Sequence, residues 1–323
     1  MITRTDILTH LERGVRVGFT VGMKSYTPLR DGFVKEQPSD GAFESYVDMG
    51  ALPWPMAGGG LAGSGGTDPR TGAETTGGLS EGGPIVVLGT EERSMIIYNR
   101  DWYVAIGVYH SAINDNRAGN LEAWARNAAV RFQQHMDFLA FDALNKGETT
   151  TDYGKAYDGL SMFNDAHVDR GAEYTTAQDN KYAVALTLDN FETVKVASSK
   201  YRDGRGQPVG LNHRLLIVPP ELERVAAQIT RNEAVYNTAN REMNPYAGTT
   251  RYIVAPGGWL DSTAWYLIDD SMPEKPIVFQ MRQQPQLVTW DDHTQGSGVR
   301  YFKWLARYTV AYGDWRLAIQ GNT

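Results

Sequence analysis

Residues 120–146 read NLEAWARNAAVRFQQHMDFLAFDALNK, and this stretch decides the fold. Apolar residues recur in it every three or four positions, the spacing that places them along one face of an α-helix. The repeat is carried by Leu121, Trp124, Ala128, Phe132, Met136, Leu139 and Ala143. Asn120 can cap the start, and Gly147 stands where helices commonly end. With a rise of about 1.5 Å per residue, the pattern predicts a spine roughly 40 Å long.

The chain before this helix predicts an arm. Asp6 can cap a helix whose apolar residues recur at helical spacing up to Val15. From Gly14 to Tyr26 the pattern is less regular, which favours an extended segment. Residues 27–50 combine Pro, Asp, Glu and Gly with little periodicity and predict an exposed connection.

Residues 58–83 are a glycine tract, because eleven of the 34 glycines of the chain fall within them. Apolar runs at 85–88 and 95–98 predict a hairpin beside the tract, and β-branched and aromatic residues at 102–109 predict a third strand. We interpret the tract as a projecting loop that a neighbouring subunit holds in place. The residues expected to contact that neighbour are Gly58, Gly60, Leu61, Gly66, Gly78 and Leu79.

After the long helix, helical and strand patterns alternate. Residues 189–198 predict a helix opened by Asp189 and Glu192 as a capping box. A buried strand at 215–218 leads into a second helix that begins at a Pro-Pro pair. Further strands are expected at 251–255, 264–268, 276–282, 299–311 and 315–319. The fold class is therefore α+β, and 323 residues exceed what one core usually serves, which predicts two subdomains.

The composition limits the function. Hydrophobic residues make up 41% and charged residues 21%, as in a globular protein. The absence of cysteine excludes disulfides, thiolate metal sites and cysteine nucleophiles. No apolar run is long enough to span a membrane, and the N-terminus does not resemble a secretory signal. The net charge of −7 argues against a surface that coats DNA throughout, but it leaves a locally basic face open.

No cofactor or metal motif is complete. Gly58, Gly60 and Gly63 match the G-x-G-x-x-G pattern of dinucleotide sites, but no strand pattern precedes them and no helix pattern follows. Acidic residues flank a histidine at 165–169 and precede one at 291–293. Neither has the spacing of a metal site, and both are interpreted as solvated loops. We therefore expect no enzyme activity, no cofactor and no metal.

Several further stretches occur in a fixed order between residues 100 and 320. They are Ile113-Asn114-Asp115-Asn116-Arg117-Ala118-Gly119, Tyr157-Asp158-Gly159 with Phe163 and His167, Leu215 to Pro220 with Leu222, Asn244-Pro245 with Gly248, Ala264 to Leu267, Lys275-Pro276 with Gln280, Arg282 and Pro285, and Ala311-Tyr312-Gly313 with Trp315. Together they resemble the major head subunit family of Mu-like tailed phages. The chain departs from that family in the glycine tract, so no contact of the loop can be transferred.

The resemblance implies the Hong Kong 97-type capsid fold, which consists of an N-terminal arm, an extended loop, a peripheral domain with a spine helix, and an axial domain. On this sequence it implies an arm at 1–45, an extended loop with flanking strands at 46–110, a peripheral domain at 111–160 and 265–312, and an axial domain at 161–264 and 313–323.

The implied function is structural. The resemblance predicts a major capsid protein, not an enzyme, that self-assembles into pentamers and hexamers of an icosahedral phage head. Its partners would be copies of itself, scaffold, portal and decoration proteins, and packaged double-stranded DNA held by non-specific contacts. The protein would be located in the virion after assembly in the host cytoplasm. The alternatives are an encapsulin-like compartment shell and a soluble α/β enzyme.

Overall fold

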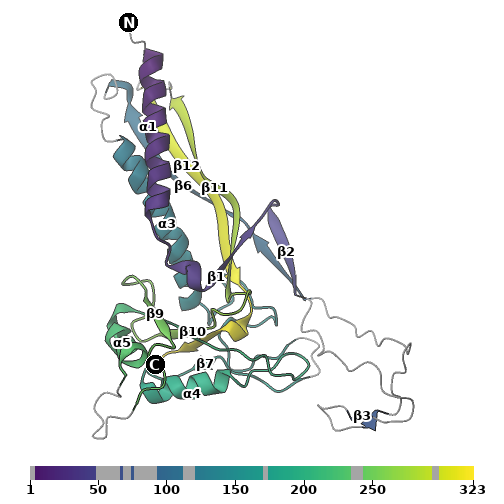
Figure 1. Cartoon of the computed structure of the whole chain (residues 1–323). Coiled ribbons are helices and arrows are strands. Elements are labelled where there is room, and N and C mark those ends of the chain that lie inside the picture. Colours follow the sequence, from purple (N-terminus) through teal and green to yellow (C-terminus); the bar gives the residue numbers. More distant parts are fainter. Residues whose placement is uncertain are drawn as a thin grey trace.

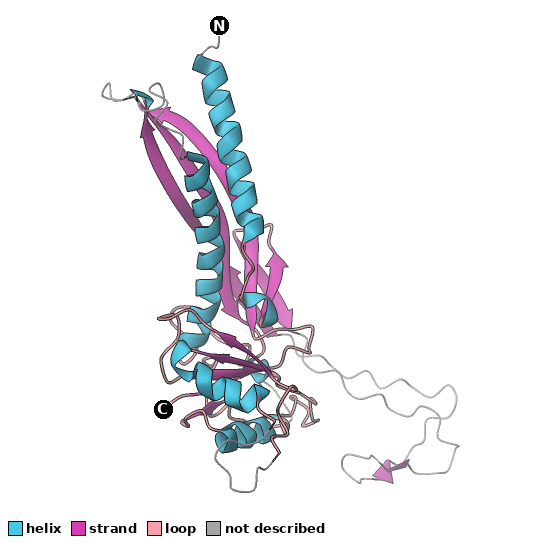
Figure 2. Ribbon diagram, turned by 60° about the vertical axis from the view of Figure 1, so that its left-hand side comes forward, coloured by secondary structure: helices cyan, strands magenta, loops and turns pink. Residues whose placement is uncertain are grey.

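The computed structural model describes residues 4–48, 66–67, 74–75, 93–111, 121–169, 174–233, 243–292 and 298–323. A long part built on a four-stranded sheet stands on a lobe with a five-stranded sheet (Figure 1). Two long helices run along the first part, and the shorter helices lie in the lobe that holds the C-terminus (Figure 2).

Helix α3 (Leu121–Asn145) confirms the predicted spine. It ends before Gly147, where any side chain would collide, since an added Cβ would lie 2.4 Å from the Phe163 ring. One residue differs from expectation: Trp124, expected in the apolar stripe, is 45% exposed. His135 is partly buried, and its Nδ1 lies 2.8 Å from the hydroxyl of Tyr308.

Helix α1 (Arg4–Ser25) is longer than predicted, and the expectation of an irregular segment from Gly14 onward is wrong. The reason is a stripe of small residues that faces α3. A Cβ added at Gly18 would lie 2.6 Å from the carbonyl oxygen of Glu122, and one at Gly22 would lie 2.5 Å from that of Arg126. Glycine therefore lets the two helix backbones touch.

A buried carboxylate joins the end of α1 to the spine helix. Asp137 has no exposed surface and accepts hydrogen bonds from the hydroxyl of Tyr26 (2.8 Å) and the backbone N–H of Leu29 (2.9 Å). The guanidinium of Arg30, in the 3-10 turn η1 (Arg30–Gly32), forms an ion pair with it at 2.8 Å and a second one with Glu36. The expectation that residues 27–50 form an exposed connection is therefore wrong.

The four-stranded sheet has the order β1-β11-β12-β6, with β1 (Val34–Pro38) parallel to β11 (Ile277–Asp292) and the other pairs antiparallel. Its centre is β12 (Val299–Tyr312), and β6 (Arg100–Tyr109) forms one edge. The pleat gives it two different faces. One face is covered by both long helices, because Phe19 stacks on Trp304 and contacts Phe132. We call the other one the open face; it carries Tyr301, Lys303, Leu305, Arg307 and Ala311 of β12.

The five-stranded sheet has the order β7-β13-β10-β8-β9. Its strands are short and their centre is buried, as the apolar run at 215–218 predicted. The bounds are β7 (Lys181–Tyr182), β8 (Leu215–Val218), β9 (Arg251–Val254), β10 (Trp265–Ile268) and β13 (Ala318–Gly321). The predicted strand at 315–319 begins instead as a 3-10 turn, η4 (Trp315–Leu317).

Two helices flank this sheet. Helix α4 (Leu188–Ser198) is capped by the hydroxyl of Thr187, which accepts from the N–H of Asn190, so the predicted Asp189–Glu192 capping box is wrong. The Pro-Pro pair leads into the 3-10 turn η2 (Pro220–Leu222) and then α5 (Glu223–Arg231).

Candidate functional site

A two-stranded ribbon attaches to the open face of the four-stranded sheet. It consists of β2 (Phe43–Asp48) and β5 (Arg93–Tyr98), paired antiparallel (Figure 1). One side of the ribbon is built onto the sheet, because Ile97 packs against Val278 and Ala311. The predicted hairpin joined 95–98 to 85–88, and 85–88 lies outside the described residues. The observed partner of 95–98 is the stretch that was expected to be an exposed connection.

A buried amide fixes the root of this ribbon. Gln280 of β11 has no exposed surface; its Oε1 accepts from the hydroxyl of Tyr46 at 2.9 Å. Its Nε2 donates to Oδ1 of Asn99 at 2.9 Å, and nearby Arg282 donates to the carbonyl of Gly41. Because each partner comes from a different strand or turn, the ribbon leaves the subunit at a defined angle.

The other side of the ribbon is apolar and uncovered. Phe43 and Tyr98 lie directly opposite each other with their ring centroids 5.8 Å apart, and Ile96 stands on the same side. Their side chains are 52%, 66% and 52% exposed, respectively. Contiguous exposed apolar groups of this kind mark interaction surfaces more often than isolated ones do.

Aromatic side chains also gather on the open face beyond the ribbon. Tyr301 lies over Gly107 and stacks on Trp290 with centroids 5.0 Å apart. Lys303 lies 4.6 Å above the ring of Tyr103, which is 66% exposed. Tyrosine, tryptophan and arginine are enriched at protein interfaces, so this face is a second candidate contact surface. The sequence of 299–305 gives no alternation that marks this face, because large side chains stand at every position from 300 to 305.

The predicted contact residues of the glycine tract fall mostly outside the described part of the chain. Gly66 lies in the two-residue strand β3 (Gly66–Thr67), which pairs with β4 (Glu74–Thr75). Outside the described residues are Gly58, Gly60, Leu61, Gly78 and Leu79. Residues 78–82, which also lie outside the described part of the chain, read GLSEG. They match the serine nucleophile pattern G-x-S-x-G, but no strand pattern leads into them.

The interpretation of 165–169 as a solvated loop is wrong. His167 is fully buried and stacks on Trp315, with ring centroids 4.1 Å apart and planes 4° from parallel. Its Nδ1 lies 2.5 Å from a carboxylate oxygen of Asp158 and its Nε2 lies 3.1 Å from Oδ1 of Asn180. The amide nitrogen of Asn180 donates to three backbone carbonyls, so Oδ1 is the acceptor and Nε2 of His167 donates. The group ties this loop to the C-terminal strand.

Two further buried groups complete the polar interior of the lobe. The guanidinium of Arg316 forms ion pairs with Asp169 and Asp314. Nε2 of His213 donates to the carbonyl of Arg316 at 3.0 Å. Burial lowers the pKa of His213 from 6.5 to about 4, so this ring is neutral at pH 7. The contact of His213 with the carbonyl of Arg316 ties two backbone segments together.

The second acidic cluster also differs from expectation, because Asp291 and Asp292 lie in strand β11 and not in a loop. Asp291 forms an ion pair with Arg300 at 3.1 Å, while His293 lies outside the described residues. Within the described ranges, no three His, Asp or Glu side chains are placed to hold a metal ion.

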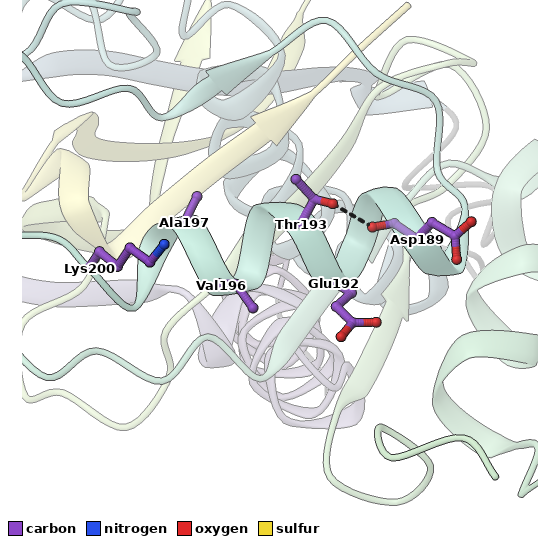
Figure 3. A pocket seen from close by; sticks show the side chains of 6 residues that line it. All are labelled: Asp189, Glu192, Thr193, Val196, Ala197 and Lys200. Carbon is purple, nitrogen blue, oxygen red and sulfur yellow. Dashed lines mark hydrogen bonds between the residues drawn. The ribbon is translucent and has the colours of Figure 1, made fainter.

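A shallow hollow lies along the exposed side of α4. Figure 3 shows that all six lining side chains come from this helix or from the residue that follows its last turn, with acidic groups at its start and Lys200 at its end. Thr193 donates to the backbone carbonyl of Asp189 at 2.8 Å. A groove along one helix supplies no convergent groups for a ligand. In the part of the chain that the structure describes, no helix is both long and apolar enough to cross a bilayer.

The comparisons with known proteins identify the family. A family model for phage capsid proteins matches residues 105–320, about two thirds of the chain. The procapsid of bacteriophage JBD30 has a TM-score of 0.56 and 16% identity, covering 100% of this chain and 76% of that chain. The mature capsid of bacteriophage PhiM1 gives 0.54 and 11%, covering 92% and 87%. The capsid of Ralstonia phage GP4 gives 0.52 and 11%, covering 92% and 91%. No curated protein sequence matches significantly.

The structural matches show that the fold is of the Hong Kong 97 type, the fold class of subunits that form phage heads. The chain belongs to the phage capsid protein family. Its role is that of a major capsid protein, the repeated subunit of a phage head, as predicted. The narrower assignment to Mu-like phages stays a prediction.

Proposed function

We propose that this subunit closes an icosahedral head through contacts made by the ribbon and the open face. The observation that carries the proposal is the two-sided ribbon: one side is built onto its own sheet, and Phe43, Ile96 and Tyr98 on the other side are uncovered. Burying an apolar side chain of this size contributes about 1.5–3 kcal/mol. Residues 49–92, which the ribbon carries, would extend the same contact to a neighbour.

The proposed domain division follows the sequence prediction. The arm is 1–45, the extended loop 46–110, the peripheral domain 111–160 with 265–312, and the axial domain 161–264 with 313–323. What supports it is the division between two sheets, each with its own helices. Strands β1 and β6 then tie the arm and the loop into the peripheral sheet.

The proposed assembly uses identical subunits in pentamers and hexamers, which requires the same surfaces to meet at slightly different angles. Scaffold, portal and decoration proteins would be the partners, assembly would take place in the host cytoplasm, and the head would enclose double-stranded DNA without catalysis by this chain. A decorated form is known for the related fold, because the capsid of bacteriophage JBD30 carries minor capsid protein trimers.

The test is electron microscopy of the purified protein, with light scattering for particle mass. Wild-type protein should form closed shells, or rings of five- and six-fold symmetry. Ile96→Ser with Tyr98→Ser should leave a folded subunit that does not assemble, as should deletion of 58–83. Val196→Ser is the matched control, because Val196 is similarly exposed but lies on α4. Normal shells from the ribbon variant would contradict the proposed contact, and a co-purifying cargo enzyme would favour an encapsulin-like compartment.

A further inference from the structure

The exposed side of the two long helices carries an excess of positive charge. We call this side the helix surface; it is formed by the outward residues of α1 and α3, which cover one face of the four-stranded sheet. Among the side chains that the structure describes, which begin at Glu12, the exposed ionisable ones are Arg13, Arg16, Lys24, Glu122, Arg126 and Arg131. These residues are five cations and one acid, so this surface is positively charged. The whole chain, in contrast, has a net charge of −7.

The three cations of α1 have no partner within the described residues. Arg13, Arg16 and Lys24 form neither an ion pair nor a side-chain hydrogen bond there. On α3, Arg126 pairs with Glu122 at 3.3 Å, while Arg131 reaches only the neutral amide of Gln134. Arg13 and Lys24 are eleven residues apart, about 16 Å along the helix axis. The helix therefore presents a line of free cations and not a single charge.

The cations of the open face are engaged within the subunit. Arg307 pairs with Asp101 at 2.5 Å, and Lys303 lies over the ring of Tyr103. Arg282, at the root of the ribbon, donates to the carbonyl of Gly41. The two sides of the sheet therefore differ: cations on the open face are already partnered, and those on α1 remain available to an external anion.

The ribbon also separates the two sides. It attaches to the open face through Val278 and Ala311, so the surfaces proposed for contacts between subunits lie on the side away from α1. In a closed shell one side of a subunit turns to the exterior and the other to the contents. A line of free cations suits the side that meets a polyanion, because phosphate contacts supply most of the affinity of non-specific DNA binding.

We propose that the helix surface binds the phosphate backbone of duplex DNA through Arg13, Arg16 and Lys24, so that α1 faces the enclosed genome. This inference rests on the proposed packaging of double-stranded DNA. A protein occupant fits less well, because the large exposed apolar groups on the described part of this surface are Val17, Val21 and Trp124, each about half exposed. Three half-exposed side chains supply little of the roughly 800 Å² per partner that a stable protein interface buries.

The experiment measures binding of unassembled subunits to a fluorescent 30-base-pair duplex over a series of salt concentrations. The triple variant R13Q/R16Q/K24Q keeps good helix formers at exposed positions. Each lost phosphate contact lowers the slope of log affinity against log salt by about 0.9, so the slope should fall by about 2.7. The control K303Q/R307Q removes two cations from the open face and should leave the slope nearly unchanged.

Three results would overturn the inference: no binding of the duplex by wild-type protein at low salt, an unchanged slope in the α1 variant, or equal losses in the two variants. If the α1 variant lost shell assembly and kept its DNA slope, an acidic protein would be the occupant instead. Electron microscopy of the same samples separates this inference from the proposed function, because wild-type protein that forms shells but ignores DNA contradicts only the former.

Discussion

The contact between α1 and α3 depends on two glycines, and a third glycine on the same helix provides the control. Adding a methyl group at Gly22 would place a carbon 2.5 Å from the carbonyl oxygen of Arg126 and 2.8 Å from the Cβ of Ala129. Optimal contacts between carbon atoms are about 3.5–4.0 Å, so the helices must separate. At Gly14 a Cβ would meet nothing within 4 Å.

The two substitutions should therefore have opposite signs. Gly→Ala in a helix gains about 1 kcal/mol from backbone propensity, and at Gly14 nothing opposes this gain. At Gly22 overpacking costs typically about 1–3 kcal/mol, which outweighs the gain. We expect Gly14→Ala to stabilise the docked arm by about 0.5–1 kcal/mol and Gly22→Ala to destabilise it by about 1–2 kcal/mol.

Hydrogen–deuterium exchange of residues 12–25 is the suitable assay, because an arm can open locally while the rest of the chain stays folded. Gly22→Ala should exchange faster than Gly14→Ala by about 10- to 150-fold, since 1.4 kcal/mol corresponds to a factor of ten. Equal protection in the two variants would refute the close contact as the force that holds the arm.

Three other predictions concern buried polar groups. The folded state favours the neutral ring of His213, so the free energy of unfolding is at its full value above pH 6.5 and falls as the pH decreases toward 4. Denaturant titrations should show a loss of about 3 kcal/mol over this range. The variant His213→Asn should remove this pH dependence. Asp137→Ala removes the buried partner of Arg30 and should lower the free energy of unfolding by about 3–5 kcal/mol. Glu36→Gln changes the exposed partner of the same arginine and should lower it by less than about 1 kcal/mol. Similar losses in the two variants would contradict a stabilising role for the buried pair. His167→Phe removes the hydrogen bond to the buried carboxylate of Asp158 and should lower the free energy of unfolding by at least about 2 kcal/mol. Adding Asp158→Leu should recover part of that loss, which a double-mutant cycle would detect.

Local patterns in the sequence predicted the elements whose determinants are local. The spine helix repeats its apolar residues along 25 positions, and β8 is a run of four apolar residues between Arg214 and a Pro-Pro pair. The composition of 27–50 predicted an exposed connection wrongly, because the determinants of this segment are not local. Phe33 is fully buried and Val34 begins β1, but what buries them is α3 and β11, which lie far away in the sequence.

The candidate surfaces were harder to predict than the helices. The ribbon partner at 43–48 is separated from 93–98 by the glycine tract, and register between distant strands is not encoded in either strand alone. His167 looked like a loop residue because Trp315, on which it stacks, follows almost 150 residues later. The close approach of α1 to α3 was detectable in principle, because Gly18 and Gly22 are spaced by four residues and so share one face of a helix.

The order of strands in the four-stranded sheet has a consequence for the time course of synthesis. Strand β6 at 100–109 and strand β1 at 34–38 gain their pairing partners only when 277–312 have been translated. At about 5–20 residues per second, β6 waits roughly 10–40 s on the ribosome. During that interval the apolar side of the spine helix has no sheet to cover it, so the nascent chain is exposed to aggregation until its last fifty residues emerge.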